Sequence, residues 1–170
     1  MTATGSGWEG YVHMVQHKYN KKKEAWTKTN ICANAAIYGK DGVAWAVSEG
    51  CPELKTYQHM QEMDDGGTLE VTVDEFQCAY DAAGGNRKPS AAGIRMGNEK
   101  YVFVRHDAEF GSTYMTRSGG GGAVAARTKE GLVIGFWNKD TQMNPKGVQN
   151  AADCGMQVEE MAQHLKDAGR

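Results

Sequence analysis

The segment that decides the fold is IRMGNEKYVFVRHDAEFGSTYMTRSGGGGAVAARTKEGLVIGFW, residues 94–137. It contains five apolar or alternating runs rich in Val, Ile, Tyr and Phe, a composition typical of β-strands. The predicted strands are Ile94 to Met96, Lys100 to Arg105, Phe110 to Arg117, Ala123 to Thr128 and Leu132 to Trp137. Turn-forming residues such as Gly97-Asn98 separate them. Because the links between neighbouring strands are short, the segment predicts an antiparallel meander.

Two more strands are predicted upstream of the meander. Residues Ile31 to Tyr38 and Val43 to Ser48 are apolar and partly β-branched, and the turn Gly39-Lys40-Asp41-Gly42 joins them. This pattern favours a hairpin. Residues Glu49 to Gly67 are polar and show no sustained period, so they are expected to form a surface excursion that is partly disordered.

Three helices are predicted around these strands. A capping box at Ser6-Gly7-Trp8-Glu9 starts the first, and a second capping box at Thr72-Val73-Asp74-Glu75 starts a short helix that ends at Gly84-Gly85. Asp153 is expected to cap the last helix. Apolar side chains recur at helical spacing in all three. These residues are Trp8, Tyr11, Val12, Val15 and Tyr19; Phe76, Ala79, Tyr80 and Ala83; and Val158, Met161, Ala162 and Leu165.

The element order predicts an α+β fold in which helices cover an antiparallel sheet. With 170 residues, the chain is expected to form one domain, 1–170, with a surface insertion at about residues 49–67. A net charge of −2 provides no global positive field for nucleic acid. The apolar runs are far shorter than a membrane span, and four dispersed cysteines favour reduced thiols in a cytosolic protein.

The motifs that could carry catalysis are weak. Gly119 to Gly122 lacks the Lys-Ser or Lys-Thr of a phosphate loop, so a hairpin turn is the better interpretation. His13 and His17 are four residues apart on the first predicted helix, but no third ligand is near in sequence, which favours two solvated histidines over a metal site. No nucleophile, base and oxyanion donor form a testable set. We therefore expect a binding protein, with no catalytic residue, cofactor or metal.

Aromatic residues suggest where such a protein binds. If the first and last helices lie side by side, Trp8, Tyr11, Trp45 and His164 converge into a shallow strip. Such strips bind proline-rich peptides, because a polyproline II helix is already extended and loses little entropy on docking. On pattern alone, the alternative that these aromatics are ordinary core residues is favoured.

Several motifs resemble the profilin family of small actin-monomer-binding proteins. Trp8-Glu9-Gly10-Tyr11-Val12 matches the family's N-terminal signature, and Ile37 to Ser48 matches its first hairpin. Gly93 to Tyr101, the Gly-Gly turn in Ser118 to Gly122, and the ending Val158 to Leu165 are similar as well. The matches are collinear over nearly the whole chain. The resemblance implies an antiparallel sheet of about six to seven strands, with the N- and C-terminal helices packed on one face and a short helix on the other.

The resemblance also implies two binding surfaces and their partners. The aromatic strip is expected to bind proline-rich proteins such as formin-like assembly factors, and a separate surface is expected to bind monomeric actin. Anionic phosphoinositides are a third expected ligand, through lysines after the first helix. The implied residues are Trp8, Tyr11, Trp45 and His164 for polyproline; Lys100, Arg105, Glu109 and Arg117 for actin; and Lys21, Lys22, Lys23 and Lys28 for lipid, with Arg117 as a further contact.

Some residues depart from the family pattern. The chain ends in Gly169-Arg170 instead of a large apolar residue, and we expect Arg170 to be a solvated end. Gly155 stands where the family commonly has Asn at its actin surface. The segments Glu49 to Gly67 and Lys18 to Lys28 are longer than in most members of the family. The alternative class is another small α+β binding module, a longin- or roadblock-like trafficking adaptor, which would lack the strip.

Overall fold

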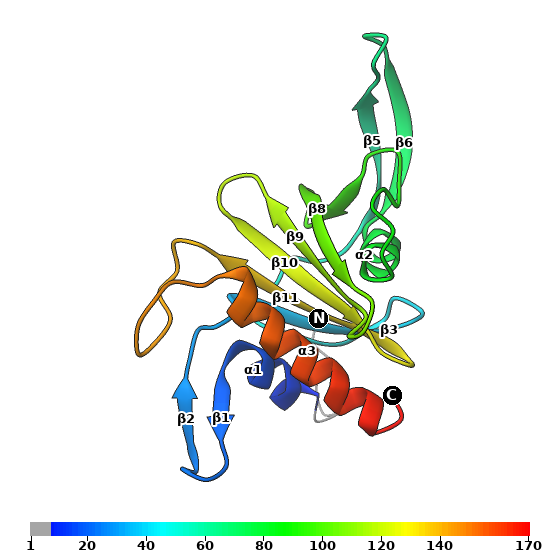
Figure 1. Cartoon of the computed structure of the whole chain (residues 1–170). Helices are drawn as coiled ribbons and strands as arrows, with labels where there is room; N and C mark the ends of the chain where they lie inside the picture. The colour runs from blue at the N-terminus through cyan, green and yellow to red at the C-terminus, as the bar shows by residue number, and fades with distance from the viewer. Residues whose placement is uncertain (1–7) are drawn as a thin grey trace.

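A seven-stranded antiparallel sheet organises the protein in the computed structural model, which describes residues 8–170. The strand order is β4-β3-β11-β10-β9-β8-β7 (Figure 1). The bounds are β3 Asn34–Gly39, β4 Ala44–Val47, β7 Ile94–Met96, β8 Glu99–Asp107, β9 Ser112–Arg117, β10 Gly121–Arg127 and β11 Gly131–Asn138. The predicted α+β class, the first hairpin and the meander are confirmed.

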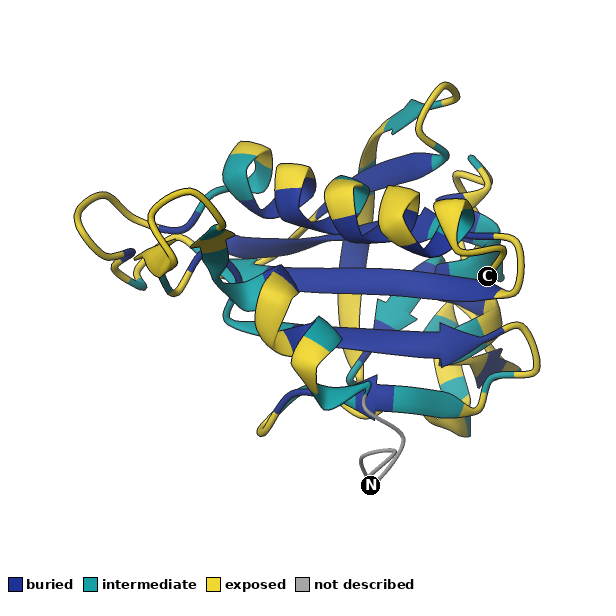
Figure 2. Ribbon diagram, turned by 90° about the horizontal axis from the view of Figure 1, so that it is seen from below, coloured by how far each residue is buried: buried dark blue, intermediate teal, exposed yellow. Residues whose placement is uncertain are grey.

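The sheet has a helical layer on each face. Helices α1 (Glu9–Gln16) and α3 (Ala151–Asp167) lie together on one face, and α2 (Glu75–Ala83) lies on the other. Successive strand residues alternate between the two cores, as the two-residue period of a strand requires. Ile37, Val124 and Val133 face α1 and α3, whereas Tyr38, Ala125 and Ile134 face α2. In Figure 2 the central strands are buried while the outer surfaces of the terminal helices are exposed.

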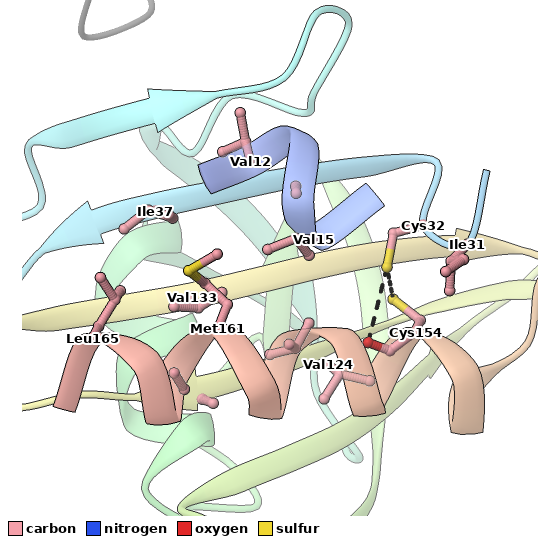
Figure 3. Packing of buried hydrophobic residues seen from close by; sticks show 14 of the residues in the cluster. Val12, Val15, Ile31, Cys32, Ile37, Val124, Val133, Cys154, Met161 and Leu165 are labelled. Atoms are coloured by element: carbon pink, nitrogen blue, oxygen red, sulfur yellow. Dashed lines mark hydrogen bonds between the residues drawn. The ribbon is translucent and has the colours of Figure 1, made fainter. Parts of the chain in front are cut away.

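The core between α3 and the sheet is closely packed. Val12 and Val15 of α1 belong to one core cluster with Met161 and Leu165 of α3 and with strand residues such as Ile37 and Val133 (Figure 3). At Gly135 of β11, a Cβ atom would lie 2.6 Å from Val158 Cγ2 and 2.9 Å from Cys154 Sγ. Only glycine therefore lets α3 approach the sheet this closely.

The cysteines of the described chain carry free thiols, three of them buried. The Cys32 and Cys154 sulfurs lie 2.6 Å apart beneath α3 (Figure 3). Burial, with the neighbouring Cys32, raises the pKa of Cys154 well above its usual value. Burial also raises the pKa of Cys51 to about 12, so both thiols stay protonated at neutral pH.

The first helix is shorter than predicted. Its expected start at Ser6 lies outside the described residues, and α1 ends at Gln16 because His17 adopts an extended backbone. The side-chain amide of Gln157 donates to the carbonyls of Met14 and His17, so α3 satisfies the end of α1. Tyr19 therefore lies in a strand, and the prediction that it belongs to the helical stripe is wrong.

Two small hairpins were not predicted. The first joins β1 (Lys18–Asn20) and β2 (Ala25–Lys28). The second joins β5 (Thr56–Glu62) and β6 (Thr68–Asp74) and projects away from the sheet (Figure 1). The expectation of an irregular, partly disordered excursion between residues 49 and 67 is thus wrong for its second half, although the segment does lie at the surface.

The helix caps also differ from the prediction. Asp74, not Thr72, caps α2 by accepting a hydrogen bond from the Gln77 amide at 3.0 Å. Asn150, not Asp153, caps α3. The Asp153 carboxylate in turn accepts a hydrogen bond from the side-chain amide of Asn150 at 2.9 Å. The Asn150 hydrogen bond, assisted by Lys28, holds the pKa of Asp153 below its usual value. Among the described residues, no helix is long and apolar enough to cross a membrane.

Candidate functional site

The four residues predicted for proline-rich ligands lie together over the ends of α1 and α3. The Trp8 ring centroid is 4.8 Å from that of Trp45 and 5.1 Å from that of Tyr11. Tyr11 in turn lies 5.5 Å from His164 on α3. Trp8, Tyr11 and Trp45 are half-buried against the core, while His164 is exposed. They form one row that combines apolar ring area with polar ring atoms, which we call the aromatic strip.

Arg170 lies over Trp8, in the middle of the aromatic strip. Its guanidinium carbon lies 5.1 Å from the Trp8 ring centroid, within the range of a cation–π contact. The backbone of Arg170 is fixed by hydrogen bonds to Leu165 and Lys129. Arg170 is exposed, but its contact with Trp8 differs from the expected solvated end, because these backbone hydrogen bonds hold the last residue against the strip.

A small hollow continues the strip beyond His164. Its volume is about 150 Å³, and Met14, Gln157, Glu160 and Met161 line it together with His164. Met14 is exposed, and Met161 belongs to the core. Sequence reasoning did not find this hollow, because its lining depends on how α1 crosses α3.

The residues predicted for actin divide between two faces of the sheet. Lys100 and Arg105 of β8 are exposed on the face that carries α3. Lys100 lies there because the next residue, Tyr101, faces α2, and Arg105 lies there because a bulge after Phe103 sets it opposite Tyr114. The Arg105 guanidinium lies 3.9 Å from the centroid of that ring. The Tyr114 hydroxyl donates to Glu159 of α3 at 3.0 Å. Burial and then Glu159 raise the pKa of Tyr114 to about 12, so it remains a neutral donor.

Glu109 and Arg117 lie apart from that pair. Glu109 is exposed in the turn between β8 and β9. Arg117 pairs in register with Tyr101, on the α2 face, and forms an ion pair with Glu99 at 3.4 Å. The structure therefore brings Lys100 and Arg105 to one face, and places Arg117 on the other.

The lysines predicted for lipid lie in and beside the β1–β2 hairpin, not at a helix end. Lys21, Lys22 and Lys23 are exposed in the turn that links the strands. Lys28, at the end of β2, forms an ion pair with Asp153 at 3.3 Å. Trp26 and Tyr19 are exposed on the same hairpin, with ring centroids 5.2 Å apart.

His13 and His17 do not have the geometry of a metal pair. Their ring centroids are 4.4 Å apart, but His17 Nδ1 accepts a hydrogen bond from the Asn30 amide at 3.0 Å. A neutral imidazole that accepts at Nδ1 carries its proton on Nε2, so neither nitrogen is available to a metal. Burial, and then the neighbouring His13, lower the pKa of His17, which favours this neutral form. No cluster of three or more metal-ligating residues occurs within residues 8–170.

A buried carboxylate that the sequence analysis assigned to a helix cap joins distant segments. Glu75 is 1% exposed and accepts four hydrogen bonds, from the Lys55, Gly97 and Asn98 amides and the Tyr57 hydroxyl. Gly97 and Asn98 form the β7–β8 turn with positive φ at both residues. Glu75 therefore fastens the base of the β5–β6 hairpin to the edge of the sheet. We call this arrangement the Glu75 clamp.

Comparison with known proteins places the chain in a family. The profilin family model matches residues 6–170. A profilin of Tetrahymena pyriformis is 30% identical over 167 residues, which cover 96% of this chain and 99% of that protein. The chain belongs to the profilin family. The trafficking-adaptor alternative is not favoured.

Solved profilin structures share the fold. Acanthamoeba castellanii profilin IA is 21% identical with a TM-score of 0.58, over 96% of this chain and 100% of that chain. Mouse profilin IIa in complex with a double repeat from the FH1 domain of mDia1 is 18% identical with a TM-score of 0.56, over 97% and 100% of the two chains. The predicted arrangement of a sheet with terminal helices on one face is confirmed.

Proposed function

We propose that this profilin binds proline-rich segments on the aromatic strip and an actin monomer on the α3 face of β8 and β9. Family membership makes the chain an actin-monomer-binding protein that also binds proline-rich segments and regulates filament assembly. The observation that carries the strip assignment is the continuous contact from Trp45 through Trp8 and Tyr11 to His164. In the mouse profilin, an FH1 repeat is the ligand, which supports formin-like partners here.

Binding energy, not catalysis, is the proposed mode of action. The strip offers ring faces to proline side chains, while its indole and phenol groups can donate to the carbonyls of a polyproline II helix. Because the two surfaces use different elements, one chain can hold an actin monomer and a proline-rich assembly factor together. The proposed domain covers the whole chain, with a cytoplasmic location as in the family.

Charge reversal tests the actin surface. Lys100→Glu with Arg105→Glu is expected to weaken binding to monomeric actin by at least about tenfold, because both cations face one exposed surface. Binding to an immobilised polyproline peptide should stay unchanged and reports that the fold is intact. An equal loss of both activities would show a folding defect, and unchanged actin affinity would remove this face from the proposal.

Lysine substitutions test the lipid surface. If Lys21, Lys22 and Lys23 contact anionic vesicles, each contributes about 1 kcal/mol, and replacing all three with Gln should abolish cosedimentation with phosphoinositide vesicles. Binding by the wild type should fall steeply as salt rises. Lys28→Gln serves as a comparison, because Lys28 already pairs with Asp153 and is expected to contribute less. If the triple substitution leaves cosedimentation unchanged, these lysines are solvated turn residues that do not contact lipid.

A further inference from the structure

The β5–β6 hairpin has two chemically different faces. Directly paired residues of an antiparallel hairpin share a face. Gln61 pairs with Leu69 and Tyr57 with Val73, which places them on an inner face whose base packs on Cys78 and Ala92. Met60 pairs with Glu70, and Glu62 pairs with Thr68, on the outer face. The hairpin therefore turns its apolar face toward the sheet and its acidic face away from it.

A cleft lies between this inner face and the outer edge of β8, beyond the short strand β7. Its volume is about 400 Å³. Gln61 lines it from the hairpin, Arg87 and Lys88 from the α2–β7 connection, and Lys100 and Val102 from β8. The Glu75 clamp holds the hairpin in this position, because it joins Lys55 and Tyr57 at the hairpin base to the β7–β8 turn.

The lining of the cleft selects for negative charge beside apolar side chains. Three cations line it, Arg87, Lys88 and Lys100, and none of its lining residues is acidic. The Phe103 ring holds the Arg87 side chain by a cation–π contact, with the guanidinium carbon 4.6 Å from the ring centroid. The lining residue Val102 is 58% exposed. Leu69 does not line the cleft itself, but it pairs with the lining residue Gln61 on the inner face of the hairpin and is 50% exposed.

We propose that this cleft takes an acidic segment of the bound actin monomer, which makes the β5–β6 hairpin an additional arm of the actin contact. The inference rests on the proposed actin surface, with which the cleft is continuous through Lys100. Its charge matches an acidic occupant, and Val102 and Leu69 supply the apolar contact. An actin monomer bound at Lys100 and Arg105 on the sheet face thus also contacts the β5–β6 hairpin at the edge of the sheet.

The experiment measures the affinity of the full chain for monomeric actin by titration. Arg87→Glu with Lys88→Glu is expected to weaken binding by at least about tenfold and to flatten its salt dependence, because opposed acidic charges then repel. Both residues are exposed, so the fold should persist. An unchanged affinity for polyproline verifies this.

A matched pair of hairpin variants tests the arm itself. Leu69→Ser is expected to weaken actin binding roughly fivefold through lost apolar burial. Met60→Ser changes a side chain of similar exposure, 55% against 50%, on the opposite face, and should leave the affinity unchanged. Equal effects of the two substitutions would overturn the assignment of the inner face.

The outcomes separate this inference from the function on which it rests. If Lys100 and Arg105 variants lose actin while the Arg87, Lys88 and Leu69 variants keep it, the arm is overturned and the actin surface stands. If the wild type does not bind actin, the proposed function itself falls. If the Arg87 and Lys88 variant loses only binding to phosphoinositide vesicles, the cleft is a lipid site and the proposal is wrong.

Discussion

Replacing Glu75 with alanine is expected to lower the free energy of unfolding by about 3 kcal/mol or more. The carboxylate is buried and accepts from three backbone amides and the Tyr57 hydroxyl. Its removal leaves these donors unpaired, and each buried unpaired donor costs about 1 to 3 kcal/mol. Urea denaturation of the variant and the wild type measures the difference.

Two further substitutions make this result specific. Glu75→Gln keeps the shape but replaces one acceptor oxygen with an amide that faces the same donors, so only part of the stability should return. Glu70→Ala removes an exposed carboxylate from the outer face of the hairpin, and its effect should stay within about 0.5 kcal/mol. A Glu75→Ala protein as stable as the Glu70→Ala protein would mean that water satisfies the clamp.

Local pattern was sufficient for the main sheet. The runs after Ala123 and Leu132 are apolar throughout because both faces of β10 and β11 are covered by helices. The glycine-containing turns at 97–98 and 119–120 indicated where the neighbouring strands end. These residues have positive φ angles, which glycine and asparagine adopt most readily. The ends of the predicted strands differ from the observed ones by only a few residues.

The two extra hairpins depend on distant partners instead. β1 and β2 carry mainly polar residues with no apolar alternation. The preceding end of α1 is satisfied by Gln157, whose side-chain amide donates to the Met14 carbonyl from 143 residues away in sequence. In β5, the inner-face positions are Tyr57, His59 and Gln61, whose mixed polarity hides the alternation. No local period could reveal these strands.

The candidate site shows the same division. The aromatic strip was predicted through the resemblance to profilins, because the spacing of Trp8 and Tyr11 alone favoured ordinary core residues. The cleft could not be predicted, since Arg87 and Lys88 have an ordinary polar context in the sequence. Only the tertiary structure brings them beside Lys100. Glu75 was found but misinterpreted, because a helix-cap pattern cannot show that a carboxylate is buried.

Trp8→Ala is expected to remove most polyproline binding, with a loss of at least about 2 kcal/mol, or roughly 30-fold in affinity. Trp8 is the centre of the strip: it contacts Trp45 and Tyr11, and Arg170 lies over its ring. Its removal therefore takes away one large ring face and also releases the side chains on both sides that the ring positions. Titration with a synthetic polyproline peptide, followed by calorimetry, measures the change.

Trp26→Ala is the matched control for this loss. Trp26 is 42% exposed on the β1–β2 hairpin, where it contacts His13 and Tyr19 instead of the strip residues. It is also a tryptophan in the same protein, so general effects of losing an indole on solubility or fluorescence are shared. We expect full polyproline affinity in this variant. Trp8 packs against the core, so its removal could also unfold the protein. The loss of polyproline affinity is therefore assigned to the strip only if the thermal unfolding and the actin binding of Trp8→Ala stay near wild type. A folded Trp8→Ala protein with unchanged affinity would show that the proline-rich ligand binds elsewhere.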